Sequence, residues 1–229
     1  MRKNGIVIAL DGPAGAGKST VGKAVASKVG YKFVSTGKMY RALAWKALQF
    51  STPLNAESIL LQLANSIKWT FPKGEGPEAD VALNGTVLRG ELITNEVSKA
   101  SSNIAMLPGI REFMKKMQQQ AGQDGGVVME GRDIGTNIFP DAELKIFLDA
   151  SAEARAKRRV SQLEKQGLPA DYHEILSFIK MRDQQDSTRE INPLKQAKDA
   201  IYLDSTEITQ DEAVEKIVRY FYNLIEASK

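Results

Sequence analysis

The sequence predicts an α/β fold: a five-stranded parallel sheet with helices on both faces, a small antiparallel insert and a helical lid. Three observations predict it. Short apolar runs alternate with helical patterns along the 229 residues, a glycine-rich loop follows the first run, and one Asn-Gly turn interrupts the alternation. Alternating strands and helices form parallel sheets that are covered on both faces. A chain of this length can form one sizeable core, so we expect a single domain over residues 1–229.

The five expected strands are short apolar runs bounded by polar residues or glycine. They are Gly5–Leu10, Lys32–Val34, Gly126–Met129, Leu144–Leu148 and Ala200–Leu203. After the first strand, apolar residues at helical spacing predict a helix over Val21–Val29 that ends at Gly30. The last helix is expected to begin at the capping box Thr209–Glu212.

The loop between the first strand and the first helix has the composition of a phosphate-binding loop. Residues 12–19 read Gly-Pro-Ala-Gly-Ala-Gly-Lys-Ser. Glycines let backbone N–H groups point at phosphate oxygens, Lys18 adds a mobile cation and Ser19 a hydroxyl for magnesium. The alternative is a glycine-rich turn without a ligand. We expect a nucleoside triphosphate at Gly12, Pro13, Ala14, Gly15, Ala16, Gly17, Lys18, Ser19 and Thr20, with magnesium at Ser19.

One region breaks the alternation of strands and helices. Between Ile67 and Thr94, Asn84-Gly85 lies between two apolar runs, which predicts an antiparallel hairpin. A hairpin inside a parallel-sheet chain indicates an inserted subdomain. We expect it at the site of a second substrate, and a structural flap is the alternative.

Arginines and aspartates follow the third strand and the later helices. Arg132 and Asp133 come directly after a buried strand and should face the same cleft as the phosphate loop. One helical face carries Arg155, Arg158 and Arg159. This face is either a solvated basic surface or part of a lid, because the break at Gly167–Ala170 that follows would allow a hinge.

A further helix carries charge on the face that should point inward. Ile175 and Ile179 begin an apolar stripe that Arg182, Asp186 and Arg189 continue. Charged groups there need partners, which an anionic ligand or intrahelical ion pairs would supply. A phosphate loop together with so many arginines favours a second phosphorylated substrate. These arginines are Arg41, Arg111, Arg132, Arg158, Arg159, Arg182 and Arg189.

Composition narrows the classes of partner. The net charge is +3, from 31 basic and 28 acidic residues, too balanced to indicate nucleic acid. No apolar run is long enough to cross a membrane, so no membrane partner is expected. The chain has no cysteine, and its only histidine, His173, lies in a polar stretch and is expected at the surface. We expect a cytoplasmic monomer.

With these residues in hand, the chain resembles bacterial-type cytidylate kinases, members of the nucleoside monophosphate kinases with a P-loop NTPase fold. The resemblance extends over essentially the whole chain. It rests on Asp11–Thr20, Thr36–Arg41, Gly131–Thr136, Phe139–Ala142, Arg182 with Asp186 and Arg189, and residues 193–205. It implies transfer of the γ-phosphoryl group of ATP, with magnesium, to CMP or dCMP.

The resemblance also implies roles for individual residues. Lys18, Arg132, Arg158 and Arg159 would act on the transferring group. Thr36, Arg111 and Asp133 would contact the cytosine, Ser102, Arg182 and Asp186 the ribose, and Arg41, Arg132 and Arg189 the monophosphate. The monophosphate-binding insert would span about 67–105 and the lid about 155–171. Ser35 departs from the family pattern, in which Asp usually precedes Thr-Gly. Glu130 stands at a position where the family has either Asp or Glu.

Three other functions stay open at this point. A kinase for another small acceptor, such as UMP, AMP or shikimate, differs only by a few hydrogen bonds in the acceptor site. A regulatory GTPase would carry Asn-Lys-x-Asp and Asp-x-x-Gly motifs, and neither occurs in the sequence. A nucleic-acid-dependent ATPase is disfavoured by the balanced charge.

Overall fold

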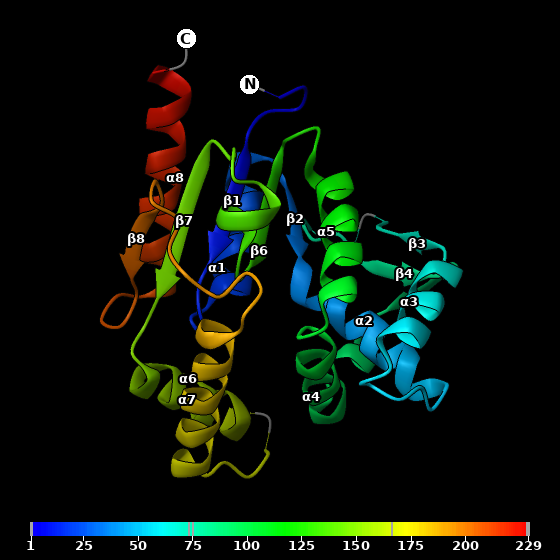
Figure 1. The fold of residues 1–229 in the computed structure, drawn as a ribbon. Helices are drawn as coiled ribbons and strands as arrows, with labels where there is room; N and C mark the ends of the chain where they lie inside the picture. Colours follow the sequence, from blue (N-terminus) through cyan, green and yellow to red (C-terminus); the bar gives the residue numbers. More distant parts are fainter. Residues whose placement is uncertain (1, 73, 75, 166, 228–229) are drawn as a thin grey trace.

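The fold is built on a parallel five-stranded sheet (Figure 1). The computed structural model describes residues 2–72, 74, 76–165 and 167–227. The strand order is β2-β6-β1-β7-β8, and every neighbouring pair is parallel. The strands are β1 (Val7–Asp11), β2 (Lys32–Ser35), β6 (Val127–Gly131), β7 (Leu144–Asp149) and β8 (Ile201–Asp204). Each of the five expected strands is confirmed, with small shifts at the ends.

Helices cover both faces of the sheet, which explains why the strands are apolar throughout. In β1, Ile8 and Leu10 pack with α1 (Lys18–Val29) and α8 (Gln210–Ala227). The alternate residues Val7 and Ala9 pack into a second cluster with α2 (Thr36–Gln49) and α5 (Pro108–Gly122). The expected end of α1 and the expected start of α8 are confirmed. Gly30 adopts the left-handed conformation at φ 71°, and Thr209 and Glu212 exchange capping hydrogen bonds.

The expected insert is present and is larger than a hairpin. It contains the antiparallel strands β3 (Trp69–Thr70), β4 (Val81–Leu83) and β5 (Thr86–Leu88), with left-handed Asn84 and Gly85 at the turn. Helix α3 (Glu57–Ser66) precedes these strands. A single 3₁₀ turn (Gly90–Ile93) and α4 (Asn95–Ile104) follow them, and α4 packs on α2.

The insert is also attached to the edge of the main sheet. The Phe33 N–H in β2 donates to the Pro77 carbonyl at 2.8 Å, and the Ala79 N–H donates to the Phe33 carbonyl at 2.9 Å. The Glu78 carboxylate pairs with Lys23 of α1 and Lys38 of α2, at 2.7 and 2.6 Å. The insert therefore contacts the helix that begins at the glycine-rich loop, a connection that no local sequence pattern predicts.

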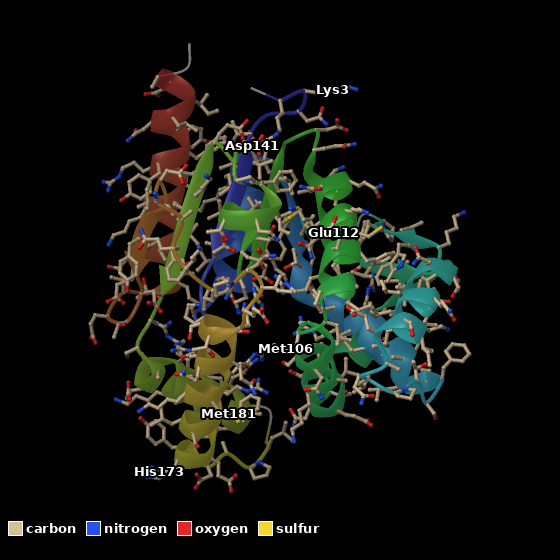
Figure 2. The ribbon with its side chains drawn as sticks, viewed as in Figure 1. Lys3, Met106, Glu112, Asp141, His173 and Met181 are labelled. Carbon is tan, nitrogen blue, oxygen red and sulfur yellow. The ribbon has the colours of Figure 1, made fainter. Side chains whose placement is uncertain are left out.

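Helices α6 (Ala152–Lys165) and α7 (Tyr172–Thr188) pack against each other beyond the carboxyl ends of the strands (Figure 1). Side chains of Ser151 and Asp171 cap their first turns. His173 is exposed near the outer end of α7, as expected (Figure 2). The charged stripe differs from the expectation at its end: α7 stops at Thr188, and Arg189 lies in extended backbone just after it. Residues 73, 75 and 166, within the expected insert and lid, lie outside the described residues.

No helix in the described part of the chain is long and apolar enough to cross a membrane.

A buried carboxylate joins the end of β1 to the loop after β6. Asp11 is 5% exposed, and its two oxygens accept the N–H groups of Ile134 and Gly135 at 2.8 and 2.7 Å. These residues begin a single wide helical turn, Ile134–Ile138. Burial raises the pKa of Asp11 to about 6, although the two N–H donors act in the opposite direction. The folded chain therefore holds this proton more tightly than the unfolded chain does.

This shift gives a pH dependence with a defined sign. Because the folded-state pKa lies above the ordinary value of 3.8, the contribution of Asp11 to stability should fall as pH rises from about 4 to about 6 and then level off. Over that window the free energy of unfolding of the wild type, relative to Asp11→Asn, should decrease by up to about 3 kcal/mol. Urea unfolding of both proteins between pH 4.5 and 7.5 measures it. A difference that rises with pH would contradict this assignment.

Candidate functional site

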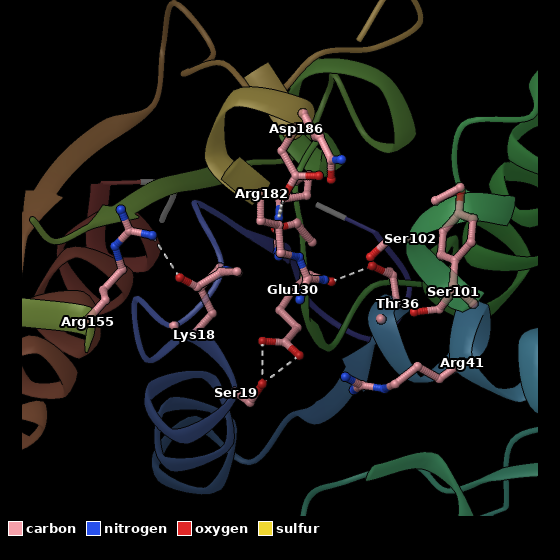
Figure 3. Close-up of a pocket in the computed structure, with 18 of the residues that line it drawn as sticks. Lys18, Ser19, Thr36, Arg41, Ser101, Ser102, Glu130, Arg155, Arg182 and Asp186 are labelled. Atoms are coloured by element: carbon pink, nitrogen blue, oxygen red, sulfur yellow. Dashed lines mark hydrogen bonds and ion pairs between the residues drawn. The ribbon is translucent and has the colours of Figure 1, made fainter. Parts of the chain in front are cut away.

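The principal cleft lies at the carboxyl ends of the parallel strands, between the glycine-rich loop, α4, and α6 with α7 (Figure 3). It has a volume of about 610 Å³. Clefts at this edge of open parallel sheets are where such folds bind ligands. Arg132 and Asp133 were expected at the same cleft as the phosphate loop, and the structure brings them together there.

The glycine-rich loop wraps around the start of α1. A side chain at Gly12, where φ is 148°, would collide with the Leu148 carbonyl of β7, so this position requires glycine. Gly15 and Gly17 also have positive φ. Lys18 folds back, and its Nζ donates to the Pro13 carbonyl at 2.6 Å. Burial lowers the pKa of Lys18 well below its usual range, and Arg132 adds to the effect. An anion in the loop would relieve both penalties.

Glu130, at the end of β6, is held by hydroxyls from three directions. The Ser19 hydroxyl lies 2.8 Å from both of its carboxylate oxygens (Figure 3). Ser35 donates to Oε1 at 2.6 Å, and Thr36 donates to the backbone carbonyl of Glu130 at 2.8 Å. Among the described residues no group of three or more metal-binding side chains converges. The Ser19 oxygen, with phosphates and water, could hold a magnesium ion, because this ion keeps several waters and binds phosphate oxygens.

Asp133 forms the centre of a second cluster. Its Oδ2 accepts from Arg111 Nη2 at 2.6 Å and from Asn137 Nδ2 at 3.0 Å, and its Oδ1 lies 3.3 Å from Arg189 Nη2. Both arginines are buried, and burial lowers the pKa of Arg189. Two guanidinium groups thus share one carboxylate, which leaves an excess of positive charge beside it.

Arg132 and Asp186 connect β6 to α7. Arg132 Nε donates to Asp186 Oδ2 at 2.8 Å, so the expected alternative of an ion pair within α7 is wrong for Asp186. Burial opposes the ionisation of Asp186, but Arg132, together with Arg182 and Arg189, outweighs burial and lowers the pKa of Asp186 below its usual value. Burial lowers the pKa of Arg182 to about 10, and the nearby charge of Arg132 contributes.

Three arginine side chains contain a buried Nε atom with no hydrogen-bond partner among the described residues: those of Arg41, Arg111 and Arg182. Buried donors are almost always satisfied in folded proteins. All three residues line the cleft. The cleft thus carries donors that a bound anion could satisfy.

The arginines of α6 do not form the uniform face that their spacing predicts. Arg155 is 4% exposed and donates to the Ala14 carbonyl of the glycine-rich loop at 3.0 Å and to Asp183 of α7 at 2.9 and 2.5 Å. Arg158 donates to the Ser205 carbonyl, whereas Arg159 is exposed and donates to Gln162. The alternative that these arginines form a solvated basic face is therefore wrong for Arg155. Its contacts fix the first turns of α6 to the glycine-rich loop.

The charges that line the cleft are strongly unbalanced. Nine basic side chains and three carboxylates line it among the described residues. The carboxylates are Glu130, Asp133 and Asp186. Cations gathered in a partly buried cleft repel one another unless anions occupy it. This excess suits two polyanionic ligands better than one.

Most of the site residues expected from the sequence line this cleft. From the loop these are Ala14, Gly15, Gly17, Lys18, Ser19 and Thr20, and beyond it they are Thr36, Arg41, Ser102, Arg111, Arg132, Asp133, Arg158, Arg159, Arg182, Asp186 and Arg189. Gly12, Pro13 and Ala16 shape the loop and do not line the cleft.

Several residues that hold the site together were not expected there from the sequence. Asp11 accepts a hydrogen bond from the loop after β6, and Asp183 accepts one from Arg155. Tyr40 lines the cleft near Asp133, and burial raises the pKa of Tyr40 to about 12. Asp11 stands directly before the loop motif, a position that could have drawn attention to it. The partner of Arg155 lies 28 residues away and left no local signal.

The sequence was also compared with protein families and known proteins. The family model for cytidylate kinase matches residues 8–223. A cytidylate kinase of Bacillus licheniformis is 46% identical over 93% of this chain and 95% of its own length. A bifunctional pantoate ligase/cytidylate kinase of a Synechococcus species is 45% identical over 97% of this chain. The chain spans 42% of the length of that bifunctional relative.

Among solved structures, an uncharacterized protein from Eubacterium ventriosum is similar in fold. The match has a TM-score of 0.51 at 14% identity and covers 94% of this chain and 98% of the other. At that identity the likeness concerns the fold alone. The family match over nearly the whole sequence carries the assignment: the chain belongs to the cytidylate kinase family.

Proposed function

We propose that the protein transfers the γ-phosphoryl group of ATP to CMP or dCMP, giving ADP and CDP or dCDP. The single observation that carries the proposal is the excess of basic groups over carboxylates in a cleft that also contains the glycine-rich loop. ATP would bind the loop, and the phosphate of the acceptor would bind Arg41, Arg132 and Arg189. Family membership supports the reaction and ATP as co-substrate.

Phosphoryl transfer needs alignment and charge stabilisation more than covalent help. Lys18 would move from the Pro13 carbonyl to the β- and γ-phosphates, and Arg132, Arg158 and Arg159 would neutralise charge on the transferring group. Ser19, whose hydroxyl donates to Glu130, would hold a magnesium ion, which would supply charge neutralisation between the phosphates.

The acceptor would be recognised by groups from α2, α4, α5 and α7 and from the segments that follow β6 and α7. Asp133, Arg111 and Thr36 would contact the cytosine, Ser102, Arg182 and Asp186 the ribose, and Arg41, Arg132 and Arg189 the monophosphate. A carboxylate at Asp133 attracts the cytosine amino group and repels the uracil carbonyl. The insert, about residues 67–105, would form one wall of this acceptor site, because Ser102 of α4 lines the cleft.

One chain supplies both binding regions, so we propose that a monomer is active. A cytoplasmic location stays a prediction from the sequence.

A first prediction concerns Lys18. Replacing it with Ala should lower kcat roughly 100- to 1000-fold, because one preorganised positive charge is lost from the transferring group. A coupled assay for ADP with CMP as acceptor measures the loss. Lys28→Ala, in the same helix but paired with Glu215 at the surface, is the matched control and should keep the parent rate. A kcat of Lys18→Ala close to that of the parent would contradict the role assigned to Lys18.

A second prediction tests the choice of base. Asp133→Asn keeps the shape of the side chain but lets its amide donate to the uracil carbonyl. The ratio of kcat/KM for CMP over UMP should fall about 10- to 100-fold, mainly through loss of CMP activity.

The control for Asp133→Asn is Asp199→Asn, which removes a carboxylate whose side chain is 65% exposed and which pairs with Lys145 away from the cleft lining. If Asp133→Asn keeps the parent preference for CMP, this carboxylate does not read the base. Arg111 and Thr36 would then be the residues to test.

A third prediction concerns a lid over residues 155–171. Arg155 is tied to Ala14 and Asp183, so we expect movement in the part of the segment beyond it. Met106 beside α4 and Met181 on α7 are each about half exposed and lie on the two arms of the molecule (Figure 2). Closure would bring such apolar surface together.

Hydrogen exchange tests the lid. Amides beyond Arg155 in this segment should exchange more slowly when a bisubstrate analogue that joins adenosine to cytidine through phosphates is bound. Amides near Arg155 should change little. Unchanged exchange along the whole segment, with binding confirmed by calorimetry, would rule out a lid.

A further inference from the structure

The hydroxyl of Ser35 has a specific partner in the structure. Ser35 ends β2 and is the register partner of Glu130 at the end of β6. Side chains of register partners on neighbouring strands point to the same face. The Ser35 hydroxyl donates to Glu130 Oε1 at 2.6 Å, and both residues are buried, at 5% and 6% exposure.

Glu130 in turn holds the hydroxyl expected to meet the metal ion. The Ser19 hydroxyl points its hydrogen at the carboxylate, with 2.8 Å to each oxygen. A hydroxyl that donates its hydrogen to a carboxylate keeps its oxygen lone pairs free for a cation. The direction of those lone pairs therefore depends on where the Glu130 carboxylate is held.

Among the described residues, only Ser19 and Ser35 donate hydrogen bonds to this carboxylate, so Ser35 is the donor that fixes it independently of the metal site. A neutral donor at this place orients the carboxylate without cancelling its charge. A second carboxylate there could not donate a hydrogen bond unless it were protonated.

We propose that Ser35 is a positioning residue for the metal–nucleotide site: its hydroxyl holds the Glu130 carboxylate against the Ser19 hydroxyl, so that Ser19 presents its oxygen to the cation. This inference rests on the proposed function, because it assumes that a divalent cation binds with the nucleotide at the glycine-rich loop. Its consequence is that Ser35 affects the cation and not the nucleotide by itself.

The experiment measures cation binding directly. Electron paramagnetic resonance gives the dissociation constant of Mn²⁺ in the presence of saturating ADP, and calorimetry gives the affinity for ADP without metal. Ser35→Ala should weaken Mn²⁺ binding about tenfold, a usual loss for a group that orients a metal ligand. The metal-free affinity for ADP should stay at the parent value. Ser101→Ala removes another buried hydroxyl, one that donates to the Ser98 carbonyl, and serves as the control.

A double-mutant cycle with Glu130→Gln separates positioning from general damage. If Ser35 acts through Glu130, adding Ser35→Ala to Glu130→Gln should change Mn²⁺ affinity by less than about twofold. A further tenfold loss in the double variant, an equal loss of metal-free ADP affinity, or parent Mn²⁺ affinity in Ser35→Ala would each overturn the proposal. Because Mn²⁺ and ADP are the only probes, a chain that fails to phosphorylate CMP would overturn the proposed function and leave this test intact.

Discussion

The organisation of the cleft depends on holding an excess of positive charge in a partly buried space. Two carboxylates pair with arginines there: Asp133 with Arg111 and Arg189, and Asp186 with Arg132. A third, Glu130, accepts hydrogen bonds from Ser19 and Ser35. Buried cations are costly without such partners. The partners are too few to neutralise the arginines, so the free protein stays ready for anionic ligands.

The rest of the fold places these groups with little freedom. Neighbouring strands end at the same edge of the sheet, which brings Ser35, Glu130 and the glycine-rich loop together. Asp11 fixes the loop after β6, and Arg155 fixes α6 and α7 to the glycine-rich loop. Rigid placement of charges is what phosphoryl transfer requires, because solvent and flexible side chains would otherwise have to reorganise during the reaction.

Local pattern predicted the strands, the first helix, the hairpin turn and the loop, because each depends on residues close in sequence. Arg132 and Asp133 could be assigned to the cleft because they follow a buried strand. The partner of Asp186, the burial of Arg155 and the pairing of Phe33 with the insert could not be predicted. These contacts join segments far apart in the chain, and their side chains have several chemically suitable partners in the sequence.

The central claim is that the cleft holds two phosphorylated ligands at once. Calorimetric titration of CMP into the protein, with and without a saturating non-hydrolysable ATP analogue, tests it most directly. The account predicts one CMP per chain in both titrations, with binding at least as tight when the analogue is present. Loss of CMP binding when the analogue is present would show that both ligands compete for one site, and would contradict the account.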